Sequence, residues 1–323
     1  MLLRFGFVAM SVLLENCSPS RAVTFKAYSS LRERDPGAAL DKVRQTAREN
    51  LLNTLRLIRH SAANNVRVYR FSSKIIPLAT HPELSGWDYI GELKETLGEI
   101  GQFVRDRGMR VSFHPDHYTL INTPREEVLE ASIRDFAHHC RLLEAMGLDA
   151  RAKLVTHVGG GYGDREKSLQ QFLQNWERLP RLITDRITLE NDDRTFTARD
   201  VLYLAEKLGL PVVLDLHHHL CHRDGGSSLE EITPRFLNTW RDTELSPKIH
   251  TSSPRGEKDR RSHHDYVDPD HLYPFLKLAR EYGQDLDVMV EAKKKDQAMF
   301  RLVKDLCGFP GIKKIDEANL EFS

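Results

Sequence analysis

The stretch RITLENDDRTFTARDVLYLAEKLGLPVVLD, residues 186–215, contains the pattern that decides the fold. Two short apolar runs, 186–190 and 211–215, each end abruptly in an acid, Glu190 or Asp215. Between them, residues 197–208 carry apolar side chains at helical spacing and stop at a glycine, the residue that most readily ends a helix. Two strands joined by a helix are typical of a βαβ unit, in which the strands run parallel.

The same alternation extends outward over the whole chain. Eight apolar runs are present, and from the second onward their ends lie 25 to 43 residues apart, enough for a strand, a helix and two loops. The runs are residues 3–8, 66–71, 110–114, 153–157, 186–190, 211–215, 247–250 and 287–291. This rhythm predicts the α/β class and a single (β/α)8 TIM barrel that occupies residues 1–323 as one domain.

Helices are predicted in the segments between the runs. Apolar residues recur at helical spacing in residues 39–59 and 91–107. The capping-box pattern of residues 123–126, with proline at its second position, predicts a helix from there to Met146. Residues 268–282 end at a glycine in the same way as residues 197–208.

Two longer segments are basic and follow strands. Residues 11–38 and 250–268 are expected to be loops on the same face of the barrel, where each is either a solvated surface or part of a binding site. Residues 306–323 show no clear pattern and stay unassigned.

Composition excludes several classes of protein. Lys plus Arg number 47 and Asp plus Glu 47, so the net charge is zero and any nucleic-acid binding requires a local patch. No run approaches the roughly 20 apolar residues of a membrane-spanning helix. The four cysteines are widely spaced, which favours a reducing compartment without disulfides. Residues 1–14 could serve as a signal peptide, but residues 2–8 fit a buried strand equally well.

The strand ends offer a set of metal-binding side chains. In a parallel barrel these ends meet at one mouth, so their residues form a single candidate site. For any one of them a hydrogen-bonded core histidine or a helix-capping acid is the simpler explanation. Six ionisable groups facing one space would incur a large desolvation cost, which divalent cations relieve. The six are His114, His157, Glu190, Asp215, His250 and Glu291.

Further histidines extend this ligand set. They lie at residues 217–219 and 263–264, the latter followed by Asp265. Such a mixture of nitrogen and oxygen ligands suits zinc, manganese or iron better than magnesium or calcium. Two or three ions are expected because the ligands exceed what one ion can use, with Glu190 as a bridging carboxylate.

Lys248 lies two residues before His250, so strand alternation sends both side chains toward the barrel interior. An ammonium group there would be repelled by nearby cations. The lysine could be deprotonated, lie away from the ions, carry a CO2-derived carbamate, or pair with a carboxylate of the barrel.

Seven short motifs occur in a characteristic order. They are SFHPDHY (112–118), THVGG (156–160), LENDD (189–193), LDLHH (214–218), KIHTSS (248–253), SHHD (262–265) and VEAKK (290–294). As a group, over about residues 4–296, they resemble the UV damage endonuclease family, and the 215–218 motif is also similar to endonuclease IV. The resemblance implies a TIM-barrel, manganese-dependent DNA repair nuclease. Such an enzyme cuts immediately 5′ of UV photoproducts, and abasic sites are a further expected substrate.

The resemblance also implies roles for individual residues. The cut would leave a 3′-hydroxyl and a 5′-phosphate and would need no nucleotide cofactor. Glu190, Lys248 and His250 would be catalytic, with Lys248 carboxylated. Zinc, magnesium and cobalt remain alternatives to manganese. The implied metal ligands are His114, His157, Glu190, Asp215, His218, Lys248, His250, His263 and Glu291.

The expected partner is damaged double-stranded DNA. In the family a polar and aromatic pair wedges into the helix opposite the lesion, and here it falls on His117 and Tyr118, with histidine where glutamine is usual. Phe7 stands where relatives often have tyrosine, so it lacks a hydroxyl. Expected phosphate contacts are Arg255, Lys258, Arg260, Lys293 and Lys294. We expect a monomer without membrane contact, cytoplasmic and associated with the nucleoid of a prokaryote.

Two other functions remain open from the sequence. A sugar isomerase or epimerase on this fold would hold one or two ions, and it would use only Glu190, Asp215, His250 and Glu291. It would leave His114, His157, Lys248 and His263 without a role. A non-catalytic protein that binds lesions and recruits others would show the same ligands and the same wedge.

Overall fold

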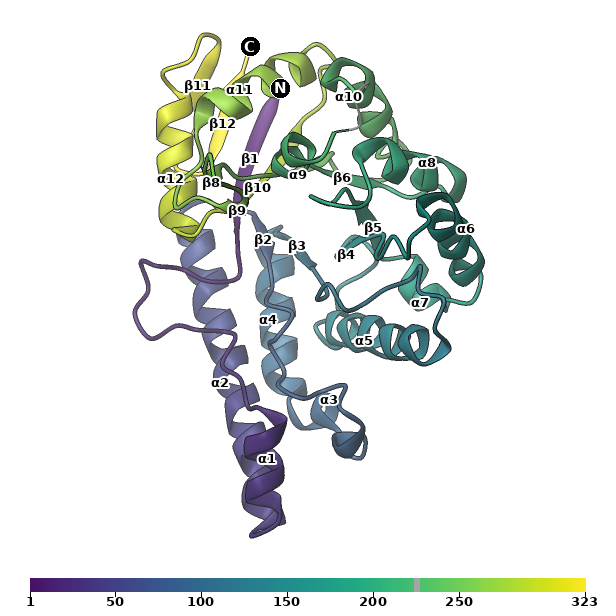
Figure 1. Ribbon diagram of the computed structural model, residues 1–323. Coiled ribbons are helices and arrows are strands. Elements are labelled where there is room, and N and C mark those ends of the chain that lie inside the picture. The colour runs from purple at the N-terminus through teal and green to yellow at the C-terminus, as the bar shows by residue number, and fades with distance from the viewer. Residues whose placement is uncertain (224–226) are drawn as a thin grey trace.

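The computed structural model describes residues 1–223 and 227–323 (Figure 1). Eight parallel strands pair in sequence order and close into a barrel when the first pairs with the last, with Phe5 opposite Val288. The predicted (β/α)8 barrel is therefore confirmed. Its strands are β1 (Leu2–Val8), β2 (Val68–Arg70), β3 (Arg110–Phe113), β4 (Lys153–His157), β5 (Ile187–Glu190), β6 (Val212–Asp215), β7 (Lys248–Thr251) and β10 (Leu286–Val290).

Helices surround the strands (Figure 1). They are α1 (Phe25–Arg32), α2 (Pro36–Ala63), α3 (Tyr89–Glu92), α4 (Lys94–Asp106), α5 (Glu126–Ala145), α6 (Arg165–Trp176), α7 (Arg181–Thr184), α8 (Ala198–Leu208), α9 (Leu216–Cys221), α10 (Leu229–Asn238), α11 (Pro269–Arg280) and α12 (Lys295–Leu306), with a 3-10 turn at Pro82–Leu84. Among the described residues, none of these helices has both the length and the apolar character needed to cross a membrane.

The basic segments expected as loops contain regular structure. Residues 11–38 include α1 and the start of α2, which lie beyond the strands at the lower end of Figure 1. Residues 250–268 include a hairpin of β8 (Pro254–Gly256) and β9 (Asp259–His263). The unassigned C-terminal residues form a second hairpin of β11 (Ile312–Lys314) and β12 (Asn319–Phe322), which pairs antiparallel with β1.

Two predicted helices differ in their boundaries. The helix expected over residues 91–107 is divided into α3 and α4, because Leu93 leaves helical angles at φ −108° and ψ 9°. The capping box predicted at Thr123 is wrong. Helix α5 starts at Glu126 without a side-chain cap, because Asn175 binds the carbonyls of Ile121 and Thr123 and holds that segment in a turn.

Strand alternation divides the side chains between the two sides of the barrel wall. On β1, Phe5 and Phe7 are fully buried outside the wall, and Phe7 packs edge-on against Tyr69 at 5.6 Å. Several inward positions are charged instead. Near the N-terminal ends of the strands, Asp287 is fully buried and accepts hydrogen bonds from Arg4 and Arg110, both at 2.6 Å. The apolar core therefore lies between strands and helices, and the interior of the barrel carries charge.

Two glycines one turn apart in α4 provide a test of this packing. A Cβ at Gly101 would lie 1.6 Å from the carbonyl oxygen of Met146, whereas one at Gly98 would meet nothing within 4 Å. We expect Gly101→Ala to lower the free energy of unfolding by about 1–3 kcal/mol or more. Gly98→Ala, the matched control, should raise it by about 0.5–1 kcal/mol because alanine favours helix. Urea unfolding of both variants would show this, and equal effects would contradict the packing of α4 on α5.

Candidate metal centre

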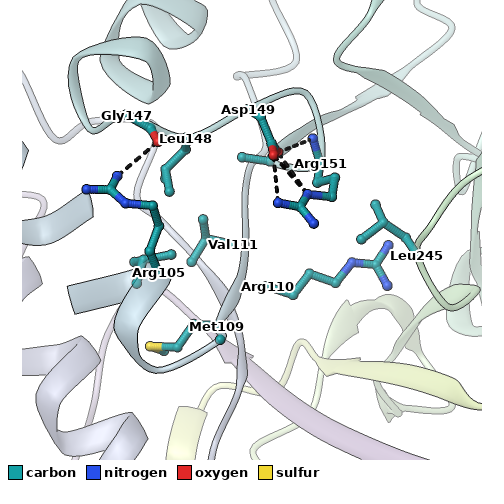
Figure 2. Close-up of a pocket in the computed structure, with 12 residues that line it drawn as sticks. Arg105, Met109, Arg110, Val111, Gly147, Leu148, Asp149, Arg151 and Leu245 are labelled. Carbon is teal, nitrogen blue, oxygen red and sulfur yellow. Dashed lines mark hydrogen bonds and ion pairs between the residues drawn. The ribbon is translucent and has the colours of Figure 1, made fainter. Parts of the chain in front are cut away.

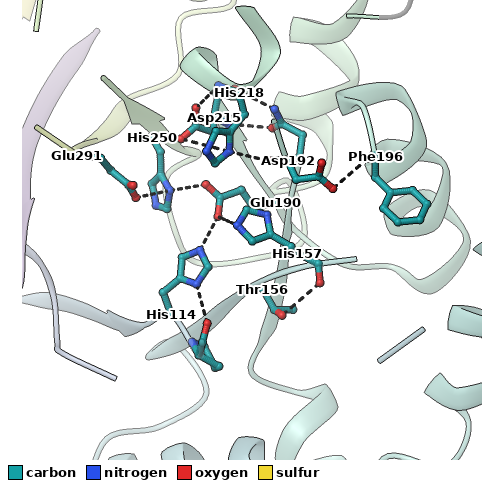
Figure 3. Close-up of polar contacts among 12 residues, drawn as sticks. His114, Thr156, His157, Glu190, Asp192, Phe196, Asp215, His218, His250 and Glu291 are labelled. Carbon is teal, nitrogen blue, oxygen red and sulfur yellow. Dashed lines mark hydrogen bonds and ion pairs between the residues drawn. The ribbon is translucent and has the colours of Figure 1, made fainter. Parts of the chain in front are cut away.

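Six predicted strand-end residues converge at the mouth of the barrel (Figure 3). Their ligand atoms fall into two groups, each with all its atoms within 4.8 Å of one another. The first group is His114, His157 and Glu190, and the second is Glu190, Asp215, His250 and Glu291. Glu190 belongs to both groups.

The Glu190 carboxylate lies at the centre of the site. Its side chain is 1 % exposed. One oxygen, Oε2, accepts a hydrogen bond from Nε2 of His114 at 2.8 Å and lies 3.8 Å from Nε2 of His157. The other, Oε1, accepts from Nδ1 of His250 at 2.6 Å (Figure 3). Burial alone would raise the pKa of Glu190, but the neighbouring histidines bring that pKa well below its usual value.

Glu291 completes the second group from the end of β10. Its Oε1 lies 3.0 Å from Nδ1 of His250 and is also ion-paired with Arg70. Burial works against the charged carboxylate, yet Arg70 and His250 hold the pKa of Glu291 well below its usual range. Arg70, at the end of β2, thus contributes a permanent cation to a mouth that is otherwise built from histidines and carboxylates.

Asp215 and His218 are brought together by the short helix α9. Asp215 caps this helix, because its Oδ1 accepts from the backbone N–H of His218 at 2.7 Å. The imidazole of His218 lies 3.7 Å from Oδ2 of the same carboxylate and donates from Nδ1 to the carbonyl of Asn191 at 2.9 Å. Asn191 also makes two hydrogen bonds to the backbone of Asp215 and so ties the ends of β5 and β6 together.

Several buried polar atoms at this mouth have no hydrogen-bond partner among the described residues. They are Oδ2 of Asp215, Nε2 of His250 and Nδ1 of His157. Leaving such atoms unsatisfied costs about 1–3 kcal/mol each. A site with these orphan atoms, three carboxylates and four imidazoles could hold divalent metal ions.

Two histidines carry unusual pKa values because of the carboxylates. Burial would lower the pKa of His250, but Glu190 and Glu291 raise it to about 9. Burial opposes the charge on His218 too, but Asp215, Glu190 and Glu291 raise its pKa to about 9. By contrast, burial lowers the pKa of His157. Protonated His250 and His218 thus balance the negative charge of the carboxylates. A bound metal ion would supply that positive charge instead of the two protons.

Lys248 is 2 % exposed inside the barrel, opposite Asp287 and Val213 in register. Burial lowers its pKa far below the ordinary lysine value, the charge of Arg110 lowers it further, and Asp287 opposes the shift. Lys248 thus lies two residues before His250 on the same strand, β7, and its surroundings disfavour the ammonium form of the side chain.

The remaining predicted histidines lie at the edge of this centre. The ring of His263 on β9 is 6.4 Å from that of His218 and 5.3 Å from that of His217. His217 contacts the carbonyl of Arg261 at 3.2 Å, which joins α9 to the hairpin. His264 accepts a hydrogen bond from the backbone of Tyr266. His263 is therefore near the cluster without joining either close group.

The residues predicted to contact DNA surround the same mouth. Tyr118 is 74 % exposed on the loop after β3, and its ring lies 4.0 Å from that of His117. Arg255, Lys258 and Arg260 are exposed on the β8–β9 hairpin. Arg261 of this hairpin forms an ion pair with Asp193 at 3.6 Å. After Glu291, Lys293 is exposed and Lys294 is half-buried at the start of α12.

A separate cavity of about 520 Å³ lies at the opposite end of the barrel (Figure 2). Its arginines are engaged within the protein. Arg105 donates to the carbonyls of Met146 and Gly147, and Arg151 pairs with Asp149. This cavity is lined by the end of α4, the start of β3 and the loops that precede β4 and β7, so it includes none of the proposed metal ligands.

Two residues of the site were not found from the sequence. Arg70 was not identified because the second apolar run continues to Phe71. The predicted end of this strand, β2, was therefore one residue too late. Alternation inward from Val68 would have identified it. Asn191 follows Glu190 directly, and only its two hydrogen bonds to Asp215 reveal its role.

The closed (β/α)8 barrel and the His and carboxylate cluster at its mouth define a TIM-barrel protein with a candidate metal centre. Residues 3–323 match the family described as UV-endonuclease UvdE. The UV DNA damage endonuclease of Bacillus pumilus is 42 % identical over 319 residues, covering 99 % of this chain and 98 % of the relative. That of Halalkalibacterium halodurans is 41 % identical over 328 residues, covering all of both chains.

Solved structures agree with this match. The crystal structure of SacUVDE superposes with a TM-score of 0.83 at 30 % identity, covering 95 % of this chain and 98 % of that one. A D-tagatose 3-epimerase-like protein superposes with a TM-score of 0.52 at 15 % identity, covering 78 % and 91 %, which shows a shared fold alone. The chain belongs to the UV-endonuclease UvdE family. It is therefore a DNA repair endonuclease that acts on damaged DNA, and the predicted resemblance is confirmed.

The two raised histidine pKa values predict how metal binding depends on pH. With pKa values raised to about 9, His218 and His250 would have to release protons in order to bind a metal ion. The affinity of EDTA-treated protein for Mn²⁺ should therefore rise between pH 6.5 and 8.5, roughly tenfold per pH unit for each proton released. Calorimetric titration in buffers of different ionisation enthalpy would count the protons. His271→Ala, which removes an exposed imidazole on α11, is the control, and an affinity independent of pH would contradict the prediction.

Proposed function

We propose that this protein hydrolyses the phosphodiester bond immediately 5′ of a UV photoproduct, leaving a 3′-hydroxyl and a 5′-phosphate, without a nucleotide cofactor. The observation that carries the proposal is the Glu190 carboxylate, shared by two groups of potential ligands at the mouth of a barrel that belongs to this family. The substrates are cyclobutane dimers and 6-4 photoproducts, and abasic sites are a further class.

The proposed cofactor is a cluster of two or three divalent ions, with manganese favoured over zinc, magnesium or cobalt. The orphan atoms of Asp215, His250 and His157 support this fit. Such ions, when bound, neutralise phosphate charge, lower the pKa of water and stabilise a departing oxygen. The proposed ligands are His114, His157, Glu190, Asp215, His218, Lys248, His250, His263 and Glu291.

The protein residues orient this centre and supply charge. Glu190, Asp215 and Glu291 provide three negative charges in a water-poor space. Arg70 holds one oxygen of Glu291 and so fixes the orientation of that carboxylate. Asn191 fixes Asp215 through the backbone in the same way.

Lys248 fits the proposed carboxylation. Its burial and lowered pKa favour the neutral amine, whose nitrogen can attack CO2. The N–C bond forms as one C=O π bond of CO2 opens, and the nitrogen releases one proton, so a neutral amine is replaced by an anionic oxygen ligand. Together with Glu190 and His250, Lys248 forms the proposed catalytic set.

Lesion recognition is proposed to depend on how easily the damaged stack opens. Tyr118 and His117 project from the mouth and would enter the helix opposite a lesion. Arg255, Lys258, Arg260, Lys293 and Lys294 surround the mouth and would contact phosphates. Phe7 is packed against Tyr69 and takes no part.

A nicking assay tests the proposed function. We expect Mn²⁺-dependent cleavage directly 5′ of a single thymine dimer in a duplex, in the absence of ATP, and none with EDTA or on the undamaged duplex. Equal cutting of both duplexes would contradict lesion specificity. Selective retention of the damaged duplex without cutting would favour the recruiting protein instead.

Substitution of the shared carboxylate gives the sharpest variant. Glu190→Gln removes the bridging charge and should reduce the nicking rate by at least about a thousandfold, while lesion binding survives in part. Glu177→Gln, on the exposed end of α6, is the matched control and should nick normally. Full activity of Glu190→Gln would refute the role of the cluster.

The exposed Tyr118 ring predicts a separate effect on recognition. Tyr118→Ala should lose about 1–3 kcal/mol of preference for damaged over intact duplex, because base stacking on an aromatic ring contributes about that much. The rate of cutting on a lesion within a pre-opened mismatch should change less. Competition binding and single-turnover nicking measure the two effects, and equal losses in both would contradict the wedge.

A further inference from the structure

The loop that joins β4 to α6 directly follows the proposed ligand His157, the last residue of β4. Its residues 159–163 read Gly-Gly-Gly-Tyr-Gly. It follows a strand, so it lies on the same face as the metal centre. Tyr162 is 46 % exposed there and is the only large side chain of the loop.

This glycine-rich loop is held firmly. The fully buried side chain of Asn122 donates to the carbonyl of Gly160 at 2.7 Å and accepts from its N–H at 3.1 Å. A Cβ at Gly159 would lie 2.1 Å from the Asn122 side chain, and the hydroxyl of Ser168 donates to the carbonyl of Gly161 at 2.7 Å. The glycines allow close packing here, so the loop presents Tyr162 in a fixed position.

The backbone at Tyr162 is strained. Its φ is +42°, in the left-handed region that a bulky side chain rarely adopts. Glycine would fit this conformation without strain, yet the position carries a tyrosine between two glycines. Such strain persists when surrounding contacts enforce it, and it occurs preferentially at functional sites.

One side of the Tyr162 ring is supported by the protein. A Cβ at Gly160 would lie 3.0 Å from two carbon atoms of this ring, so the ring lies directly over the glycine backbone. Nearly half of the side chain remains open to solvent. A ring supported on one side and open on the other is suited to stacking against a flat partner.

Asn122 also relates this ring to the proposed wedge. It lies four residues after Tyr118 on the loop that follows β3, so its two hydrogen bonds to Gly160 join the loops that carry the two exposed tyrosines. The two rings are thus displayed from adjacent, connected loops on the face that contains the metal centre.

We propose that Tyr162 is a stacking platform for a nucleobase that has left the duplex next to the cleavage site. This inference rests on the proposed function and adds a specificity-determining residue to it. A nucleobase is the fitting ligand because every base has a π-face, so stacking tolerates lesions of different shapes. A rigid ring also loses little conformational entropy on binding.

Steady-state nicking of the dimer-containing duplex tests the proposal. Tyr162→Ala should raise KM at least roughly fivefold, because a base loses its stacking partner, while kcat changes less than twofold. Tyr162→Phe keeps the π-face and should restore the wild-type KM. Tyr282→Ala is the matched control, since Tyr282 is 43 % exposed between α11 and β10 at the other end of the barrel.

Tyr162→Gly separates binding from folding. It relieves the positive φ, so its melting temperature should be unchanged or higher while KM rises as in Tyr162→Ala. A lower melting temperature for the glycine variant would overturn the proposal, because the ring would then be structural. So would a KM for Tyr162→Ala within twofold of wild type, or an equal rise for Tyr282→Ala. A wild-type chain that does not nick would instead refute the proposed function on which this inference rests.

Discussion

The buried carboxylate of Glu190 needs hydrogen-bond donors and a compensating positive charge, and the mouth of the barrel is organised around that need. His114 approaches one oxygen at 2.8 Å and His250 the other at 2.6 Å, from strands on opposite sides of β5. This arrangement depends on the parallel register of β4, β5, β6 and β7, because alternate residues of each strand point inward. A shift of one residue in β5 would turn Glu190 toward the helices and leave the histidines without a centre.

The same charges would allow the site to fold without a cofactor and to bind metal ions afterwards. Protonated His250 and His218, both with a pKa of about 9, balance the carboxylates of Glu190, Asp215 and Glu291. Ions that displace these protons would meet ligands already oriented by Arg70 and Asn191, so little reorganisation is required. In the proposed function these roles are separated, because the proposed ligands lie at the strand ends while the proposed DNA contacts lie on the loops and hairpin that follow them.

Much of the fold was predictable from the sequence because most strands are short apolar runs that end in a polar or charged side chain. Elements without such a pattern were not predictable. The β8–β9 hairpin is charged and mostly exposed, so it lacks apolar periodicity, and β12 is recognised through its pairing with β1 and β11. At Thr123 a local capping pattern was overridden by a tertiary contact with Asn175. The six strand-end residues were placed together correctly, whereas Arg70 was missed because Phe71 extends its run.

The central claim is that Glu190 joins two metal positions at the mouth of this barrel. Anomalous diffraction from Mn²⁺-soaked crystals, recorded above and below the manganese edge, tests it most directly. We predict at least two peaks, one near His114 and His157 and one near Asp215, His250 and Glu291, with the Glu190 carboxylate between them and extra density on Nζ of Lys248. A single peak away from Glu190, or no peak at the mouth, would contradict the claim.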